Sequence, residues 1–124
     1  MNDFRLGDLQ LAIMQVLWSA GPSTVADVHE ALADRALAYT TIATMLRKME
    51  DRRLVEHDTA GRRFVYQAAV SAEEVTRSMT GDLLDRLFEG SLANMVHHML
   101  TEREVSADEL QQLHALIDQR KRRG

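Results

Sequence analysis

The chain has 124 residues, of which 45% are hydrophobic and 27% charged, a balance that excludes a disordered chain and fits one ordinary domain or a smaller domain with a helical extension. The absence of cysteine excludes disulfides, thiolate metal sites and a cysteine nucleophile. The formal net charge of -4 argues against nucleic-acid binding unless basic residues gather locally.

The first eight residues lack the basic stretch and apolar run of a signal peptide. No uninterrupted apolar segment approaches the roughly 18 residues that cross a bilayer. We therefore expect a cytoplasmic protein without membrane insertion.

Three helices are predicted in the first half of the chain. Asp8 can cap the first, whose apolar residues follow the spacing of one buried face until Gly21-Pro22 ends it. A capping box at Thr24 opens a short second helix that reaches about Arg35, and a third follows from Tyr39 to Arg52. The predicted core of this region is Leu9, Ile13, Val16, Leu17, Val28, Leu32, Ile42, Leu46 and Met49.

The pattern then changes to that of a β-hairpin. The segments 54–57 and 63–67 are rich in β-branched and aromatic residues, and Asp58-Thr59-Ala60-Gly61 between them is typical of a turn. Helix, helix, helix and hairpin in this order predict a winged helix-turn-helix domain over residues 1–70.

Helices are predicted again in residues 71–124. Capping boxes at Ser71 and Ser106 open a long helix and a last one, with a short amphipathic helix between them after Gly90. Because so short a chain has no second core to cover their apolar faces, we expect these faces to form a dimer. The predicted dimerisation residues are Met79, Leu83, Leu87, Phe88, Leu92, Met95, Val96, Met99, Leu100, Leu110, Leu113, Leu116 and Ile117.

The third helix is the predicted reader of DNA sequence. At 100° per residue its threonines and cations lie opposite its apolar arc, where hydroxyls, methyl groups and cations can meet base edges and phosphates. Two cations at the hairpin tip suit the flanking backbone, and residues 47–63 hold six basic against four acidic residues. The predicted DNA-binding residues are Tyr39, Thr40, Thr41, Ala43, Thr44, Arg47, Lys48, Arg62 and Arg63.

Several of these segments resemble the penicillinase repressor family (BlaI/MecI-type winged-helix transcriptional regulators). The resemblance lies in 6–10, 16–18, 24–28 and 37–49, above all in Tyr39-Thr40-Thr41, and continues through 53–55 and the wing at 61–66. It covers residues 6 to about 117 and weakens after residue 70. It implies a homodimeric repressor that carries winged-helix domains and a helical dimerisation region, and two such domains would read a palindromic operator.

The resemblance leaves the inducing signal open. Some members are released from DNA when a membrane-embedded sensor protease triggers cutting between an asparagine and a phenylalanine, and His98-Met99 stands at the corresponding place. Proteolytic induction by such a partner is therefore in doubt. A copper-responsive branch carries paired cysteines that this chain lacks.

No catalytic, metal or cofactor site is predicted. The five histidines form no metal-ligand motif, and the paired carboxylates Glu73-Glu74 and Asp108-Glu109 are explained by their place in the first turns of helices. We therefore expect a DNA-binding repressor and not an enzyme. The alternative is a winged-helix module that binds another protein and no DNA.

Overall fold

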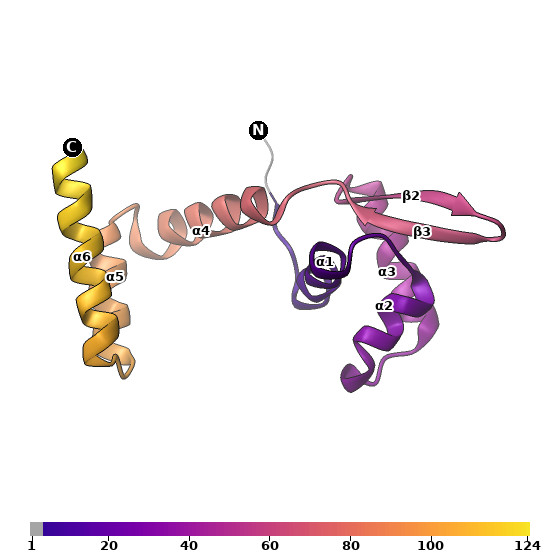
Figure 1. Cartoon of the computed structure of the whole chain (residues 1–124), viewed down its shortest axis with the longest axis horizontal. Helices are drawn as coiled ribbons and strands as arrows, with labels where there is room; N and C mark the ends of the chain where they lie inside the picture. The colour runs from indigo at the N-terminus through magenta and orange to yellow at the C-terminus, as the bar shows by residue number, and fades with distance from the viewer. Residues whose placement is uncertain (1–3) are drawn as a thin grey trace. The chain divides into compact units, whose positions relative to one another are not determined.

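The computed structural model describes residues 4–124 and is mainly helical, with one small antiparallel sheet (Figure 1). The elements are α1 (Asp8–Ala20), β1 (Ser23–Thr24), α2 (Val25–Ala31), a 3-10 turn (Ala33–Arg35), α3 (Tyr39–Asp51), β2 (Val55–Ala60), β3 (Arg63–Ala68), α4 (Ala72–Phe88), α5 (Leu92–Glu102) and α6 (Ala107–Arg123). The predicted order of helices and hairpin is confirmed.

The helix starts follow the local sequence signals. The Thr24 side chain accepts a hydrogen bond from the Asp27 backbone N–H, and the Asp27 carboxylate accepts one from the Thr24 N–H. Ser71 and Glu74 form the same reciprocal pair at α4, and the Ser106 hydroxyl accepts from the Glu109 N–H at α6. Each capping bond satisfies a backbone donor that has no partner within the helix.

Two predicted helix ends differ from the structure. Asp8 is the first residue of α1, and Gly7 stands at the N-cap position. The second helix stops at Ala31 and is followed by the 3-10 turn Ala33–Arg35, and the next residue, Ala36, takes a left-handed conformation at φ 54°. The prediction of one continuous helix to Arg35 was wrong because the backbone changes to the narrower 3-10 form after Ala31 and then turns at Ala36 to start α3.

The hairpin is longer than predicted and turns at a different place. Strands β2 and β3 pair from Val55 with Ala68 to Ala60 with Arg63, so the loop is Gly61-Arg62 and not residues 58–61. Gly61 has φ +64°, a conformation that a residue without Cβ adopts at little cost. The unpredicted strand β1 pairs Ser23 with Tyr66 and Thr24 with Val65, giving the order β1-β3-β2.

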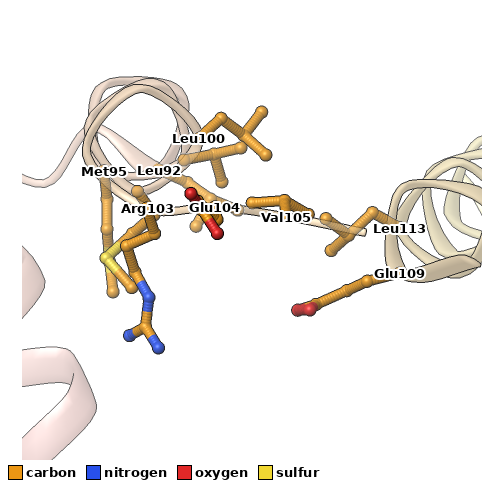
Figure 2. A pocket seen from close by; sticks show the side chains of 10 residues that line it. Leu92, Met95, Leu100, Arg103, Glu104, Val105, Glu109 and Leu113 are labelled. Atoms are coloured by element: carbon orange, nitrogen blue, oxygen red, sulfur yellow. The ribbon is translucent and has the colours of Figure 1, made fainter. Parts of the chain in front are cut away.

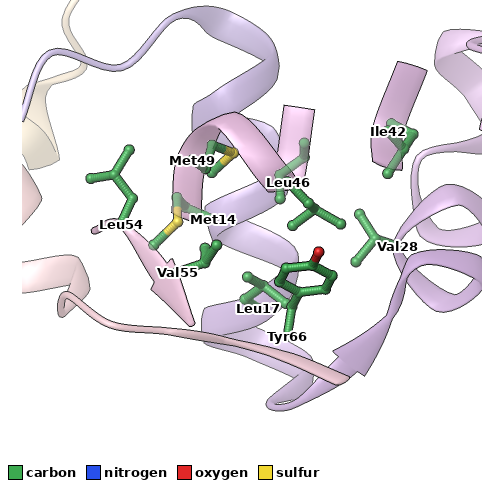
Figure 3. Close-up of a cluster of buried hydrophobic side chains, with 10 residues drawn as sticks. Met14, Leu17, Val28, Ile42, Leu46, Met49, Leu54, Val55 and Tyr66 are labelled. Atoms are coloured by element: carbon green, nitrogen blue, oxygen red, sulfur yellow. The ribbon is translucent and has the colours of Figure 1, made fainter. Parts of the chain in front are cut away.

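The core lies where α1, α2 and α3 meet the sheet (Figure 3). Its buried residues are Ile13, Met14, Leu17, Val28, Ile42, Leu46, Met49, Leu54, Val55 and Tyr66. Six of the nine predicted core residues are among these, whereas Leu9, Val16 and Leu32 are only partly buried and pack against the cluster. The core therefore holds α3 against both the other helices and the hairpin.

Further contacts extend this packing to the start of α4. The Trp18 indole Nε1 donates to the Val70 carbonyl at 2.9 Å, the Phe4 N–H donates to the Ser78 hydroxyl, and Val75 is buried. The chain separates into two compact units, and the boundary between them in the sequence follows Gly81, within α4. The second, which we call the helical unit, is Asp82–Gly124. The functional division after residue 70 stays a prediction.

The Thr24–Asp27 capping pair predicts a specific acid sensitivity. Hydrogen bonds from the Thr24 backbone and side chain hold the pKa of Asp27 below its ordinary value of 3.8. Because the pKa is lower in the folded chain, the charged carboxylate stabilises the fold above that value, and the contribution is lost as the pH falls through the folded pKa. Asp27→Asn is expected to lower stability at neutral pH and to weaken the acid-induced loss.

Urea unfolding at neutral pH and in steps below pH 4 measures this effect. The matched control is Asp34→Asn, which changes an exposed aspartate in the 3-10 turn. An acid-induced loss that is the same in Asp27→Asn as in the parent would contradict the assignment.

Candidate nucleic-acid interface

Helix α3 has one buried and one exposed side, as its periodicity predicts. Ile42, Leu46 and Met49 are fully buried, whereas Thr40, Thr41, Thr44, Arg47 and Lys48 are exposed. The core therefore fixes the orientation of a helix whose hydroxyls and cations face outward. A hollow of about 280 Å³ runs along this outer side and is lined by Thr40, Thr41, Thr44, Met45 and Lys48.

Ala43 and Met45 on α3 are neither fully buried nor fully exposed. Ala43 is partly buried, so it presents only part of its methyl group. Met45 is also only partly buried, and its Sδ lies 3.6 Å from the Gln10 side-chain nitrogen. The apolar arc of α3 thus reaches the rim of the outer hollow.

The hairpin forms a wing beside α3. Its tip, with Arg62 and Arg63, projects away from the helices (Figure 1), and both arginines are exposed. A second hollow of about 260 Å³ is lined by Thr24, Val25, Ala26, Tyr39, Arg62, Arg63 and Phe64. The start of α3 and the wing therefore share one concave surface that carries two cations.

Tyr39 opens α3 at the edge of this concave surface. Its ring is half exposed and meets the His29 ring edge-on, with the centroids 5.9 Å apart. The His29 Nε2–H donates to the Leu37 carbonyl at 2.8 Å, which ties α2 to the link before α3. These contacts position Tyr39, one of the predicted DNA-binding residues.

Arg52 directly follows α3, and its side chain forms hydrogen bonds with other parts of the protein. Its guanidinium donates to the Gln10 side-chain oxygen at 3.1 Å and to the Arg5 carbonyl at 2.9 Å. It therefore ties α3 to the N-terminal segment, a role that a count of local basic residues does not reveal.

Tyr66 on β3 lies in the core, with 4% of its surface exposed. Burial raises the pKa of its hydroxyl, and the nearby Glu50 carboxylate raises it further while Arg47 opposes it. The phenol therefore stays neutral where the sheet crosses α3.

The helical unit exposes much of its apolar surface. Among the predicted dimerisation residues, Leu83, Leu87, Leu92, Val96, Met99, Leu100, Leu110, Leu116 and Ile117 are exposed, and Met79, Phe88, Met95 and Leu113 are partly buried. A hollow of about 350 Å³ lies between α5 and the start of α6, and Leu92, Met95, Leu100, Val105 and Leu113 contribute apolar side chains to it (Figure 2). Surfaces of this kind mark interaction sites in soluble proteins.

Within residues 4–124, no group of histidines and carboxylates is arranged to hold a metal ion. No helix in the same range is long and apolar enough to cross a membrane.

The profile of the penicillinase repressor family matches residues 6–119. The chain belongs to the penicillinase repressor family. It is 25% identical to the penicillinase repressor of Bacillus licheniformis over 120 residues, which are 96% of this chain and 94% of that protein. It is 42% identical to the transcriptional regulator BlaI of Mycobacterium tuberculosis over 82 residues, which are 64% of this chain and 59% of that regulator.

Solved structures agree with this family in fold. A MarR/EmrR family regulator from Acinetobacter matches with a TM-score of 0.50 at 19% identity, covering 97% of this chain and 77% of that one. A mutant MarR from E. coli matches with a TM-score of 0.52 at 15% identity, covering 92% and 76%. The predicted winged-helix fold and the predicted family are thus confirmed, and the family is one of transcriptional regulators, which are not enzymes.

Proposed function

We propose that this member of the penicillinase repressor family is a sequence-specific DNA-binding repressor that acts as a homodimer on a palindromic operator. The observation that supports this most strongly is the outer side of α3, where three threonines and two cations are exposed over a helix fixed by its buried side. Helices presented in this way enter the major groove in helix-turn-helix proteins. The wing cations would then lie on the flanking phosphate backbone.

The net charge of -4 is compatible with this proposal because the charges are unevenly placed. Arg47 and Lys48 lie on the outer side of α3, and Arg62 and Arg63 at the wing tip. Acidic residues are in excess after residue 70, in the helical segment that we assign to dimerisation. DNA would meet the local cations and not the average charge.

The size of the winged-helix module and the apolar surface of the C-terminal helices support dimerisation. A single winged-helix module buries limited surface on DNA, whereas two joined modules read two half-sites about one or more helical turns apart. The exposed leucines of α4, α5 and α6 supply a surface for joining them. Occupation of a promoter by such a dimer would block transcription, and we propose that the repressor does so in the cytoplasm.

We include no proteolytic release in the proposal. His98 and Met99 lie within α5, and the asparagine-phenylalanine pair that a sensor protease system cuts in some relatives is not there.

Selection of bound DNA from a random pool tests the proposal directly. A recovered palindrome would support sequence-specific binding, two-fold symmetry and a defined half-site spacing together. A winged helix that binds only proteins would enrich no sequence and show no salt-dependent DNA binding, and this result would overturn the proposal.

The outer side of α3 predicts a loss of sequence preference on truncation. Thr44→Ala or Arg47→Ala is expected to cost about 1 to 3 kcal/mol of binding to the selected operator and to relax discrimination at one base pair. Gel shifts on the operator and on single-base variants measure both effects. Equal binding of parent and both variants to every site would remove these residues from the reading surface.

The wing predicts a different effect. Arg62→Ala is expected to weaken binding to all DNA sequences alike and to reduce the slope of log affinity against log salt by about 0.9, because one phosphate contact is lost. Titrations at several salt concentrations measure the slope. A loss confined to the selected operator would show that Arg62 contacts a base edge instead.

A further inference from the structure

Glu50 on α3 and His57 on β2 join the wing to the helix that we propose reads DNA. The His57 Nδ1 lies 2.8 Å and 2.7 Å from the two carboxylate oxygens of Glu50. Since a carboxylate only accepts, Nδ1 carries the proton and donates. Both side chains are about 30% exposed or less, so solvent weakens this bond less than it weakens a fully exposed pair.

The same histidine contacts the aromatic side chain next to the wing arginines. The rings of His57 and Phe64 stack with their centroids 4.0 Å apart and 20° between their planes. His57 is opposite Tyr66 in the strand register and Phe64 is opposite Thr59, so the stack runs diagonally across the hairpin. Phe64 follows Arg62 and Arg63 directly and lines the same hollow as they do.

The outer half of the hairpin has a further ring contact, in which Phe64 meets Tyr66 edge-on with the centroids 6.3 Å apart. Strand β1 pairs only with Val65 and Tyr66 of β3, so Arg63 and Phe64 have a neighbouring strand on one side alone. Isolated two-stranded hairpins are marginally stable in water. The contacts from Glu50 through His57 to Phe64 are the ones that link this half of the hairpin to a side chain of α3.

We propose that Glu50 and His57 are positioning residues that couple the wing to α3, so that Arg62 binds DNA with full effect only while this pair is intact. The inference rests on the proposed function, because it concerns the same DNA-binding surface. It predicts that the binding effects of the pair and of Arg62 are not additive. A pair that merely stabilised the fold would leave them additive.

The test is a double-mutant cycle on the selected operator with the full chain. Arg62→Ala is measured in the parent and in the His57→Phe and Glu50→Gln backgrounds. His57→Phe keeps an aromatic ring for Phe64 and loses the bond to Glu50. Glu56→Gln is the matched control, because it removes the same charge from a residue whose carboxylate accepts a hydrogen bond from the Gln67 side chain at 2.9 Å, within the hairpin.

Arg62→Ala is expected to lose about tenfold in affinity in the parent and in Glu56→Gln, and about twofold or less in the His57→Phe and Glu50→Gln backgrounds. The same tenfold loss in all four backgrounds would overturn the proposal. Urea unfolding checks that each background is folded. If His57→Phe does not fold, the cycle is measured with Glu50→Gln alone.

A measurement without DNA separates this inference from the proposed function. Backbone ¹⁵N relaxation of residues 60–64 is expected to show faster and larger motion in His57→Phe and in Glu50→Gln than in the parent. If the parent binds no DNA, the proposed function fails while relaxation still reports on the pair. Unchanged relaxation in both variants would show that the pair does not position the wing.

Discussion

Replacing Leu46 with alanine is expected to remove about 2 to 5 kcal/mol from the free energy of unfolding. Leu46 is fully buried and lies in the cluster between α1, α3 and the sheet (Figure 3). The truncation removes buried methyl groups and leaves a cavity that close-packed neighbours fill only in part. Because small domains are stable by only about 5 to 15 kcal/mol, the loss is a large share of the total.

Urea unfolding measures this loss as a lower midpoint at an unchanged slope. Lys48→Ala, on the exposed side of the same helix, is the control and is expected to change stability by no more than about 0.5 kcal/mol. Similar losses for the two variants would contradict the assignment of a buried and an exposed side to α3.

The sequence predicted the helices well because their signals are local. The capping pairs at Thr24 and Ser71 and the cap at Ser106 act over three residues, so the sequence alone determines them. The exposed position of the α3 threonines follows from the helical period in the same way. Their exposure needs only the identity of the apolar side, which Ile42, Leu46 and Met49 reveal.

The hairpin was predicted less exactly because its register depends on contacts distant in sequence. Residues 58–60 have the composition of a turn, yet they pair with β3 since Tyr66 must face the core. Strand β1 has two residues and no periodicity to detect. Leu54, Val55 and Tyr66 could be assigned to the core only once this register was known.

The shared surface of α3 and the wing also depends on tertiary structure. Arg52 falls among basic residues in the sequence, but only the structure turns it to Arg5 and Gln10. His57 was one of five histidines without a motif, and the carboxylate that it contacts is seven residues away on another element. The sequence carries no spacing rule that would have paired them.

The double change Leu116→Asp with Ile117→Asp is expected to make the protein monomeric and to lower operator affinity by about a hundredfold or more. These side chains are 60% and 54% exposed on α6, so the fold of one chain does not need them apolar. In the proposed dimer they would be buried, and burying unpaired carboxylates is costly. Each module would then bind its half-site without the gain that joining them provides.

Sedimentation equilibrium and gel shifts on full and half operators measure the two effects together. The matched control is Gln111→Asp with Ala115→Asp, which adds the same charge on the opposite side of α6, where both residues are exposed. The control is expected to stay dimeric, so any loss it shows reports the added charge alone. If the Leu116 and Ile117 variant remains dimeric and binds the full operator like the control, the α6 apolar face is not part of the dimer, and the exposed residues of α4 and α5 would have to supply the interface instead.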